Sequence, residues 1–223
     1  MVLTGAGISA ESGLKTFRDS NGLWEGYNVY EVATPGGFAA NPKLVLDFYN
    51  YRRRDIAKAL PNEAHKGLAE LQNYFNVQII TQNIDDLHER ADSKNVLHLH
   101  GEIFKMRSVK NAIKTYPIFN EIHVGDLAED GGQLRPHIVW FEEPVPNIGE
   151  AANITSAADI FVVIGTSLQV YPAAGLVAYA SKYIPKFIVD KKIPQTNITN
   201  LTVIESTACN GIKILKEKLI ELK

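Results

Sequence analysis

The sequence contains almost no cysteine. Cys209 is the single cysteine among 223 residues. An intramolecular disulfide and a cysteine-rich zinc site are therefore excluded, and the reducing cytoplasm is the expected compartment. The neighbours Ala208 and Asn210 supply no base that could activate the thiol. We therefore do not expect Cys209 to be a catalytic nucleophile.

A basic excess and long apolar runs are also absent. The formal net charge is −2, whereas proteins that bind nucleic acids usually carry a clear positive excess. No apolar run approaches the ~20 residues of a membrane-spanning helix. Residues 1–5 lack the basic start and apolar stretch of a secretory signal. We expect neither a nucleic-acid partner nor a membrane partner.

Short apolar runs rich in valine and isoleucine are present, and they predict buried strands. They are Met1–Thr4, Val77–Thr81, Ile160–Ile164, Lys186–Asp190 and Leu201–Ile204, with Val96–Leu99 as a shorter sixth candidate. Helical stretches separate them, at Pro42–Leu60, Asn62–Phe75, Pro172–Tyr183 and Asn210–Leu222. Strands that alternate with helices predict an α/β fold with a doubly wound parallel sheet.

Two regions interrupt this alternation. Residues 13–38 are rich in glycine and proline and predict a long loop, and residues 105–137 have mixed polarity and predict a small inserted lobe. We assign the sheet domain to residues 1–37, 77–101 and 138–223. The small lobe is assigned to residues 38–76 and 102–137.

A glycine-rich turn follows the first predicted strand. Residues 5–10 read Gly-Ala-Gly-Ile-Ser-Ala, which matches the G-x-G-x-x-A pattern of nucleotide-binding loops. A tight structural turn is the alternative. The acidic residue that hydride-transfer enzymes carry ~20 residues later is missing. The pattern therefore predicts a nucleotide site, but not that of a standard dehydrogenase.

Further motifs follow the other strands. They are Thr81-Gln82-Asn83-Ile84-Asp85, His98-Leu99-His100-Gly101, the segment Leu134–Phe141 and Gly165-Thr166-Ser167. With Gly5–Ser9, they resemble the sirtuins, which are NAD-dependent protein-lysine deacylases, from residue 2 to about residue 211. The similarity is greatest to bacterial sirtuins that also remove acidic acyl groups. It implies a Rossmann-like sheet, NAD as cofactor, acyl-lysine proteins as partners and a monomer.

The resemblance also implies roles for individual residues. The implied NAD-binding residues are Gly5, Ala6, Gly7, Thr16, Phe17, Arg18, Gln82, Asn83, Asp85, Gly165, Thr166, Ser167, Asp190 and Ala208. Asn83 and Asp85 resemble the pair that holds the nicotinamide carboxamide and its ribose. Phe17 and Arg18 resemble the loop that covers the cofactor. Asp190 departs from the family, which often has asparagine there.

His100 resembles the catalytic base of the family. In that chemistry it accepts a proton from a ribose hydroxyl, and the products are free lysine, nicotinamide and O-acyl-ADP-ribose. An imidazole suits this role because its ordinary pKa of ~6.5 lies near the working pH. We expect purely structural roles for the remaining histidines, which are His65, His88, His98, His123 and His137.

The predicted helix Pro42–Leu60 carries Tyr49 and Arg52 three residues apart, and therefore on one face. Within the sirtuins this spacing resembles the subgroup that prefers succinyl-, malonyl- or glutaryl-lysine. A guanidinium and a phenol can receive an anionic acyl group that an apolar channel would reject. Val139 and Trp140 resemble further substrate-binding residues. The alternative is that the arginines at positions 52–54 form a solvated basic face.

The zinc ligands of most sirtuins are missing. Four cysteines would be expected between Lys105 and Leu134, but this stretch contains none, and Ser108 stands near the first expected position. We predict that no zinc is bound. A small apolar cluster is expected to hold the lobe instead, formed by Val109, Ile113, Tyr116, Ile118, Phe119, Ile122, Val124 and Leu127.

Two other functions remain open. An ADP-ribosyltransferase could use the same NAD site and transfer to a protein side chain. A non-enzymatic sensor of NAD or ADP-ribose would also keep the site, but should lack the base at position 100 or the asparagine at position 83.

Overall fold

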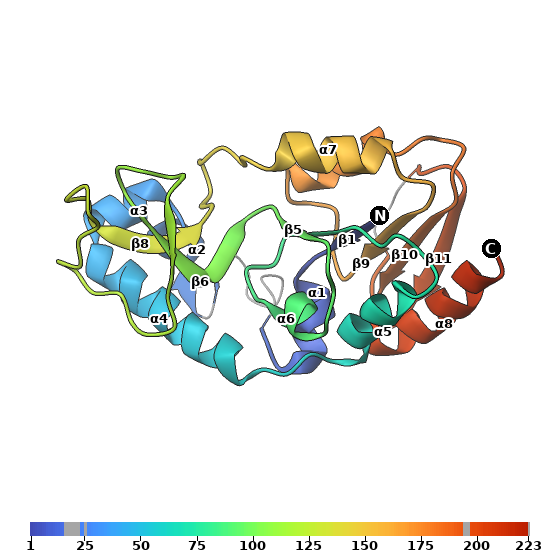
Figure 1. Ribbon diagram of the computed structural model, residues 1–223, viewed down its shortest axis with the longest axis horizontal. Helices are drawn as coiled ribbons and strands as arrows, with labels where there is room; N and C mark the ends of the chain where they lie inside the picture. Colours follow the sequence, from blue (N-terminus) through green and yellow to red (C-terminus); the bar gives the residue numbers. More distant parts are fainter. Residues whose placement is uncertain (16–22, 25, 194–196, 223) are drawn as a thin grey trace.

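The protein has two lobes of different size, with the sheet domain on the right of Figure 1 and the small lobe on the left. The computed structural model describes residues 1–15, 23–24, 26–193 and 197–222. The larger lobe contains a six-stranded sheet, and the smaller lobe contains a three-stranded antiparallel sheet. The predicted α/β class with an inserted lobe is confirmed.

The large sheet is parallel, with strand order β11-β10-β9-β1-β4-β5. Its strands are β1 (Val2–Thr4), β4 (Ile79–Thr81), β5 (Val96–His98), β9 (Phe161–Ile164), β10 (Lys186–Asp190) and β11 (Leu201–Glu205). All six predicted strands are present, and their ends differ from the predictions by at most two residues. The chain builds outward from β1 in one direction and from β9 in the other. Ligands of such sheets bind beyond the carboxyl ends of the strands at this reversal point.

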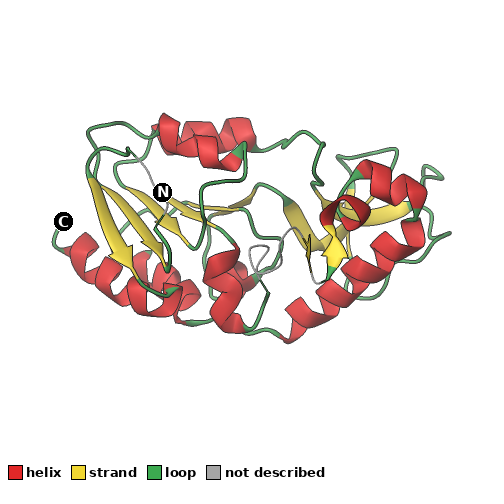
Figure 2. Cartoon of the chain, turned by 180° about the vertical axis from the view of Figure 1, so that it is seen from behind, coloured by secondary structure: helices red, strands yellow, loops and turns green. Residues whose placement is uncertain are grey.

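Helices cover both faces of the sheet (Figure 2). One face packs on α5 (Glu63–Leu71) and α8 (Ala208–Ile220), and the other on α7 (Ile148–Ser156) and the 3₁₀ helix η3 (Ala173–Tyr179). Successive strand residues point to opposite faces, so Val2 joins the first core and Leu3 the second. Both faces of the sheet are therefore buried, which explains why the strands are continuous apolar runs in the sequence.

Helix α5 corrects the predicted domain boundary. We predicted residues 38–76 for the small lobe, but Ala64, Leu68 and Leu71 of α5 belong to the core beneath the large sheet. A Cβ added to Gly67 would lie 2.5 Å from Ile212 Cγ1 of α8, so the two helices are in close contact. The first insertion therefore ends near the end of α4 (Pro42–Lys58).

The region predicted as a long loop contains regular structure. Just before it lie α1 (Ala6–Ser9) and η1 (Ala10–Ser12). The elements within it are β2 (Leu23–Trp24), β3 (Tyr27–Asn28), α2 (Val29–Val32) and α3 (Pro35–Ala40), of which α3 runs past its predicted end. Asn28 caps α2, and Thr34 caps α3 with Pro35 at the first helical position. Gly13 ends η1 and Pro35 begins α3, so these two residues mark helix boundaries.

The small lobe packs α4 against β6 (Gly101–Ser108), β7 (Thr115–Pro117) and β8 (Leu134–Ile138). The apolar face of α4 supplies Val45, Phe48 and Ile56 to a core shared with Ile103 and Ile138. Helix α6 (Leu87–Arg90) lies between the two lobes. Among the described residues, no helix is long and apolar enough to cross a membrane.

The predicted apolar cluster of the small lobe was wrong for most of its members. Ile113 is 93 % exposed and Phe119 is 79 % exposed, while Ile122 is buried. Val109, Val124 and Leu127 are also exposed, and Tyr116 and Ile118 are half-buried.

A buried arginine holds this part of the lobe. Arg53 Nε donates to the Ile103 carbonyl at 2.9 Å, and its Nη1 donates to the Asn120 carbonyl at 3.0 Å and to Asn50 Oδ1 at 2.9 Å. Asn50 in turn bonds both backbone polar groups of Ile122. Burial lowers the pKa of Arg53 to about 10. The inserted segment is therefore held by a hydrogen-bonded arginine on α4.

Candidate functional site

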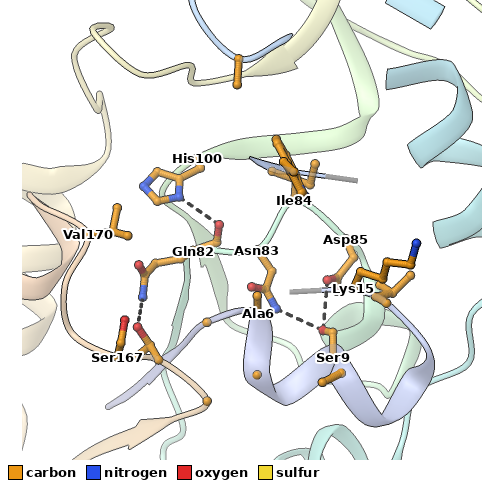
Figure 3. Close-up of a pocket in the computed structure, with 18 of the residues that line it drawn as sticks. Ala6, Ser9, Lys15, Gln82, Asn83, Ile84, Asp85, His100, Ser167 and Val170 are labelled. Atoms are coloured by element: carbon orange, nitrogen blue, oxygen red, sulfur yellow. Dashed lines mark hydrogen bonds between the residues drawn. The ribbon is translucent and has the colours of Figure 1, made fainter. Parts of the chain in front are cut away.

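A cavity of about 480 Å³ lies between the two lobes, at the carboxyl ends of the sheet strands. It is lined by every predicted site residue that the structure describes, namely Gly5, Ala6, Gly7, Tyr49, Arg52, Gln82, Asn83, Asp85, His100, Val139, Trp140, Gly165, Thr166, Ser167, Asp190 and Ala208. Thr16, Phe17 and Arg18 lie outside the described residues. Residues far apart in sequence thus share one space (Figure 3).

The glycines after β1 and β9 allow two loops to touch. Gly7 N–H donates to the Gly165 carbonyl at 2.8 Å. A Cβ on Gly7 would lie 2.7 Å from Gly165 Cα, and a Cβ on Gly165 would lie 2.3 Å from the backbone nitrogen of Ile8. Gly165 also has a φ of +65°, which favours glycine. The second glycine of the motif therefore serves loop–loop packing, and its amide is not available to a phosphate as the pattern alone suggested.

Ser9 joins the two residues expected at the nicotinamide end. Its Oγ donates to Asp85 Oδ2 at 3.1 Å and accepts from Asn83 Nδ2 at 3.1 Å (Figure 3). Burial raises the pKa of Asp85, which also accepts the Leu87 amide. Each carboxylate oxygen can accept two bonds, so Asp85 retains capacity for an amide ligand. Ser9 was quoted within the glycine motif but was not predicted as a site residue.

Two buried histidines, His65 and His88, pack beneath the site and contact Ser9 and Thr4. His65 Nε2 lies 3.4 Å from Ser9 Oγ, and His88 Nε2 lies 3.0 Å from Thr4 Oγ1. The two rings meet edge to face at 5.0 Å. Burial lowers the pKa of His65 to about 4 and that of His88 well below its ordinary value. Both rings are therefore neutral near pH 7, in keeping with the structural roles expected for them.

His100 presents a basic nitrogen to the cavity. Its Nδ1 lies 3.0 Å from the Gln82 carbonyl oxygen (Figure 3). A carbonyl can only accept, so Nδ1 carries the proton and Nε2 keeps its lone pair. Burial lowers the pKa of His100 below its ordinary value. The ring is therefore neutral near pH 7 and can accept a proton at Nε2.

The far end of the cavity is aromatic and cationic. Tyr49, fully buried on α4, accepts a hydrogen bond from Trp140 Nε1 at 3.0 Å. Burial raises its pKa, so the phenol is neutral. The guanidinium carbon of Arg52 lies 5.2 Å from the Trp24 ring centroid, and Arg52 is only 5 % exposed. The alternative prediction, that the arginines at positions 52–54 form a solvated basic face, is therefore wrong for Arg52. Of the three arginines, only Arg54 is exposed.

Trp140 is itself held by a charged group. Glu143 accepts from the Trp140 amide at 2.8 Å and from both Nη atoms of Arg135, at 2.7 and 3.0 Å. The Arg135 guanidinium lies over the Trp140 ring, 3.2 Å from its centroid. These contacts fix the indole that bonds Tyr49.

Sequence reasoning missed a further set of lining residues. Besides Ser9 they are Ala10, Leu14, Lys15, Trp24, Ala33, Ile56, Ile84, Ile138, Phe141, Glu142, Glu143, Val145, Val170, Tyr171, Pro172, Val189, Lys191, Lys192 and Ser206. Most are apolar, and Ile84, Ile138 and Phe141 stand within the quoted motifs without an assigned role. Lys191 and Lys192 directly follow β10, and their place after a strand end was the available signal.

The residues in place of the zinc module do not fit a metal. Ser108 Oγ donates to Asp130 Oδ1 at 2.8 Å, and Lys110 Nζ bonds the Asp130 carbonyl. Within the described ranges, no group of three or more histidine, cysteine, aspartate or glutamate side chains could hold a metal ion. The absence of zinc stays a prediction.

Comparison with known proteins identifies the family. The Sir2 family profile matches residues 5–172. An NAD-dependent protein deacylase of Helicobacter pylori (strain ATCC 700392 / 26695) is 50 % identical over 223 residues, which is 100 % of this chain and 97 % of that protein. One from Bacteroides thetaiotaomicron is 48 % identical over 227 residues, with 99 % and 97 % covered.

Solved structures agree with this assignment. A Sir2 homologue in complex with NAD has a TM-score of 0.88 at 35 % identity, covering 100 % of this chain and 89 % of that one. A Sir2 bound to an acetylated peptide has a TM-score of 0.80 at 30 % identity, covering 97 % and 91 %. The fold, the position of the cavity and these likenesses together place the chain in the Sir2 family.

Proposed function

We propose that this protein is an NAD-dependent protein-lysine deacylase that prefers acidic acyl groups, such as succinyl, malonyl and glutaryl, over acetyl. It transfers the acyl group from lysine to the ADP-ribose part of NAD and, with one water consumed, yields free lysine, nicotinamide and O-acyl-ADP-ribose. The observation that carries this proposal is one cavity in which a neutral histidine base lies between polar strand ends and an arginine–tyrosine pair.

The sheet side of the cavity fits NAD. Asn83 and Asp85 offer the donor and acceptor that a carboxamide requires, and Ser167, Asp190 and Ala208 line the same space toward β10 and α8. Relatives named NAD-dependent protein deacylases support the cofactor. When bound, NAD supplies the electrophilic ribose carbon that receives the acyl group.

His100 acts as the general base. Its Nδ1–H is engaged by the Gln82 carbonyl, which fixes the tautomer and directs Nε2 to accept a proton. Gln82 is tied in turn by its Nε2 to Thr166 Oγ1 at 3.0 Å, so the segment that orients the base is joined to the loop after β9. The base is therefore held by the same elements that form the NAD site.

Tyr49 and Arg52 receive the acyl carboxylate. An anion buried among aromatic rings is costly unless it is paired, and a guanidinium provides strong charge-assisted hydrogen bonds. Because Tyr49 accepts the indole proton of Trp140, its own hydroxyl proton is the one it can donate. A neutral acetyl group would leave these polar groups without a charged ligand.

The two alternatives share the NAD site. An ADP-ribosyltransferase would transfer to a protein side chain, and a sensor would bind without reaction. The buried pair at positions 49 and 52 favours the deacylase, because neither alternative needs a cationic wall for an acyl group.

The test measures nicotinamide release from NAD with peptides of one sequence that carry succinyl-lysine, acetyl-lysine or unmodified lysine. A deacylase releases nicotinamide only with acyl-lysine, and the proposed preference gives the higher kcat/KM with succinyl-lysine. Release with unmodified lysine and ADP-ribose on the peptide would indicate the transferase. Binding of NAD without release would indicate the sensor.

A further inference from the structure

The ring of His98 lies directly behind Asn83. His98 is the last residue of β5 and is buried. Its Nδ1 lies 3.0 Å from the Asn83 carbonyl oxygen, and its Nε2 lies 2.8 Å from Glu89 Oε1 of α6. Both ring nitrogens therefore face oxygen atoms at hydrogen-bond distance.

This arrangement requires two protons on the ring. A carbonyl oxygen can only accept, and an ionised carboxylate can only accept. A neutral imidazole carries one N–H, so its second nitrogen would direct a lone pair at an oxygen. Only the imidazolium satisfies both contacts, and its bond to Glu89 is charge-assisted.

A comparison with His100 makes the point sharper. His100 Nδ1 holds the Gln82 carbonyl in the same way that His98 Nδ1 holds the next carbonyl, that of Asn83. The difference lies at Nε2, which faces the cavity in His100 and faces Glu89 in His98. His98 and His100 thus differ in charge: His100 is a neutral base, and His98 is a cation.

We propose that His98, kept as an imidazolium by Glu89, is a positioning residue that holds Asn83 in place at the nicotinamide end of the cavity. The inference rests on the proposed NAD site. Neither His98 nor Glu89 lines the cavity, so both act through Asn83 rather than by contact with a ligand.

Of the hydrogen bonds that hold Asn83, the one at its carbonyl depends on pH. Its amide donates to Thr81 Oγ1 at 3.1 Å, and its side chain donates to Ser9 Oγ at 3.1 Å. These bonds do not depend on a titratable group. The carbonyl contact does, because a neutral ring keeps a single N–H. When that proton stays at Nε2 with the ionised Glu89, Nδ1 directs a lone pair at the Asn83 carbonyl.

The charges around His98 favour the cation. Glu89 faces it from α6, Asp85 lies in the segment before α6, and Glu102 faces it from β6 with Lys105 as its ion-pair partner. His88 on α6 is also close and is neutral. Burial alone would lower the pKa of His98, but the hydrogen bond and charge of Glu89 raise it above its ordinary value. The imidazolium is therefore expected to persist to higher pH than that of an ordinary histidine.

Two measurements test the proposal. The first is an NMR titration of the His98 ring in the wild-type protein, assigned with a His98→Gln variant. The second is the pH profile of kcat/KM for NAD in wild type, Glu89→Gln and the matched control Glu102→Gln. Glu102 is another carboxylate near the ring and makes no hydrogen bond to it, so the Glu102→Gln variant controls for a general change in charge.

We expect the His98 ring to titrate above the ordinary histidine value of ~6.5. Glu89→Gln should move the alkaline limb of the profile to lower pH. At pH values between the His98 titrations of the variant and of the wild type, it should raise KM for NAD up to about tenfold, the size of one lost charge-assisted contribution. Glu102→Gln should stay close to wild type.

A His98 ring that titrates at or below ~6.5 in the wild-type protein would overturn the proposal, whether or not the variants fold. Equal profiles for Glu89→Gln and Glu102→Gln would also overturn it. If the ring titrates high but no acyl-lysine peptide supports nicotinamide release, the proposed function fails, and the KM readout is replaced by the affinity for NAD measured by calorimetry.

Discussion

Three consecutive arginines on α4 have three different environments. Arg52 lines the cavity beside Trp24. Arg53 is buried and donates hydrogen bonds to other segments of the small lobe, and Arg54 forms an ion pair with Glu121 at the surface. The helix rotates about 100° per residue, so neighbours in sequence face different surroundings. A charge run in sequence therefore does not imply a charged face.

The cavity arginine should control the choice of acyl group. Tyr49→Phe combined with Arg52→Met should lower kcat/KM for a succinyl-lysine peptide about 100-fold, because charge-assisted bonds to the acyl carboxylate are lost. The loss for the acetyl-lysine peptide should be about tenfold or less. Arg54→Met is the matched control on the same helix and should leave both values near wild type. Equal losses on the two peptides in the double variant would contradict the assigned role.

The neutral histidine behind Ser9 should make stability depend on pH. Burial lowers the pKa of His65 to about 4, below its unfolded value of about 6.5. Its contribution is fully present above pH ~6.5 and is lost as the pH falls toward ~4, amounting to about 3 kcal/mol. The pKa of His98 is raised instead, so its contribution is lost at higher pH, as the pH rises from ~6.5 through its folded value.

Urea unfolding at a series of pH values measures this dependence. His65→Gln should flatten the decrease between pH 6.5 and 4, whereas the exposed control His123→Gln should not. An unchanged slope in His65→Gln would show that other groups cause the loss.

Residues with a chemical pattern could be predicted, and residues with a supporting role could not. Gln82, Asn83 and His100 follow strands in polar motifs, and all three line the cavity. Ser9 and His65 support the site through contacts across 56 residues of sequence, which no local pattern encodes. Glu143 lies only eight residues after its partner Arg135, but no sequence pattern shows that the turn after β8 brings the two side chains together.

At the scale of elements, strands were predicted more accurately than the packing of helices. A buried parallel strand has a continuous apolar run, and β10 matches its predicted bounds. Helix α7 was missed because its buried residues are Ala151 and Thr155, which give a weak apolar stripe. Helix α5 was predicted, but its periodicity could not say which lobe it would cover.

The contact between the loops after β1 and β9 makes a prediction at this scale. Gly165→Ala should destabilise the protein by about 3 kcal/mol, because a positive φ and a backbone clash add together. It should also weaken NAD binding, since both loops line the cavity. Gly149→Ala in α7, where a Cβ meets nothing within 4 Å, is the matched control and should be neutral or stabilising by about 0.5 kcal/mol. Thermal unfolding and calorimetry measure both effects, and normal NAD affinity in Gly165→Ala would refute the second.

At the scale of the whole molecule, hydrogen bonds hold the inserted segment of the small lobe together. Gln133 accepts the Gly125 amide at 2.7 Å and donates to the carbonyls of His123 and Asp126 at 2.9 and 3.1 Å. One side chain thus ties together the turn near the position where the family's metal module would lie. With Arg53, it gives the inserted segment two polar anchors.

A metal-free lobe should not respond to chelators. We expect less than 0.1 zinc per chain in purified protein, on the order of background for a chain without thiolate ligands. EDTA should leave the unfolding temperature unchanged, because no metal binding energy, about 10 kcal/mol in small zinc modules, is present to lose. Elemental analysis and thermal scans measure both, and one zinc per chain would refute the prediction.

The cavity has walls of two origins. Its cofactor side consists of loops that follow the strands of the large sheet. Its far end consists of Tyr49 and Arg52 from α4, Trp24 from β2 and Trp140 from the segment after β8. In evolutionary terms, these two walls are encoded in separate stretches of the gene. On the proposed function, mutations on α4 can change which modification is removed while the residues of the cofactor side stay as they are.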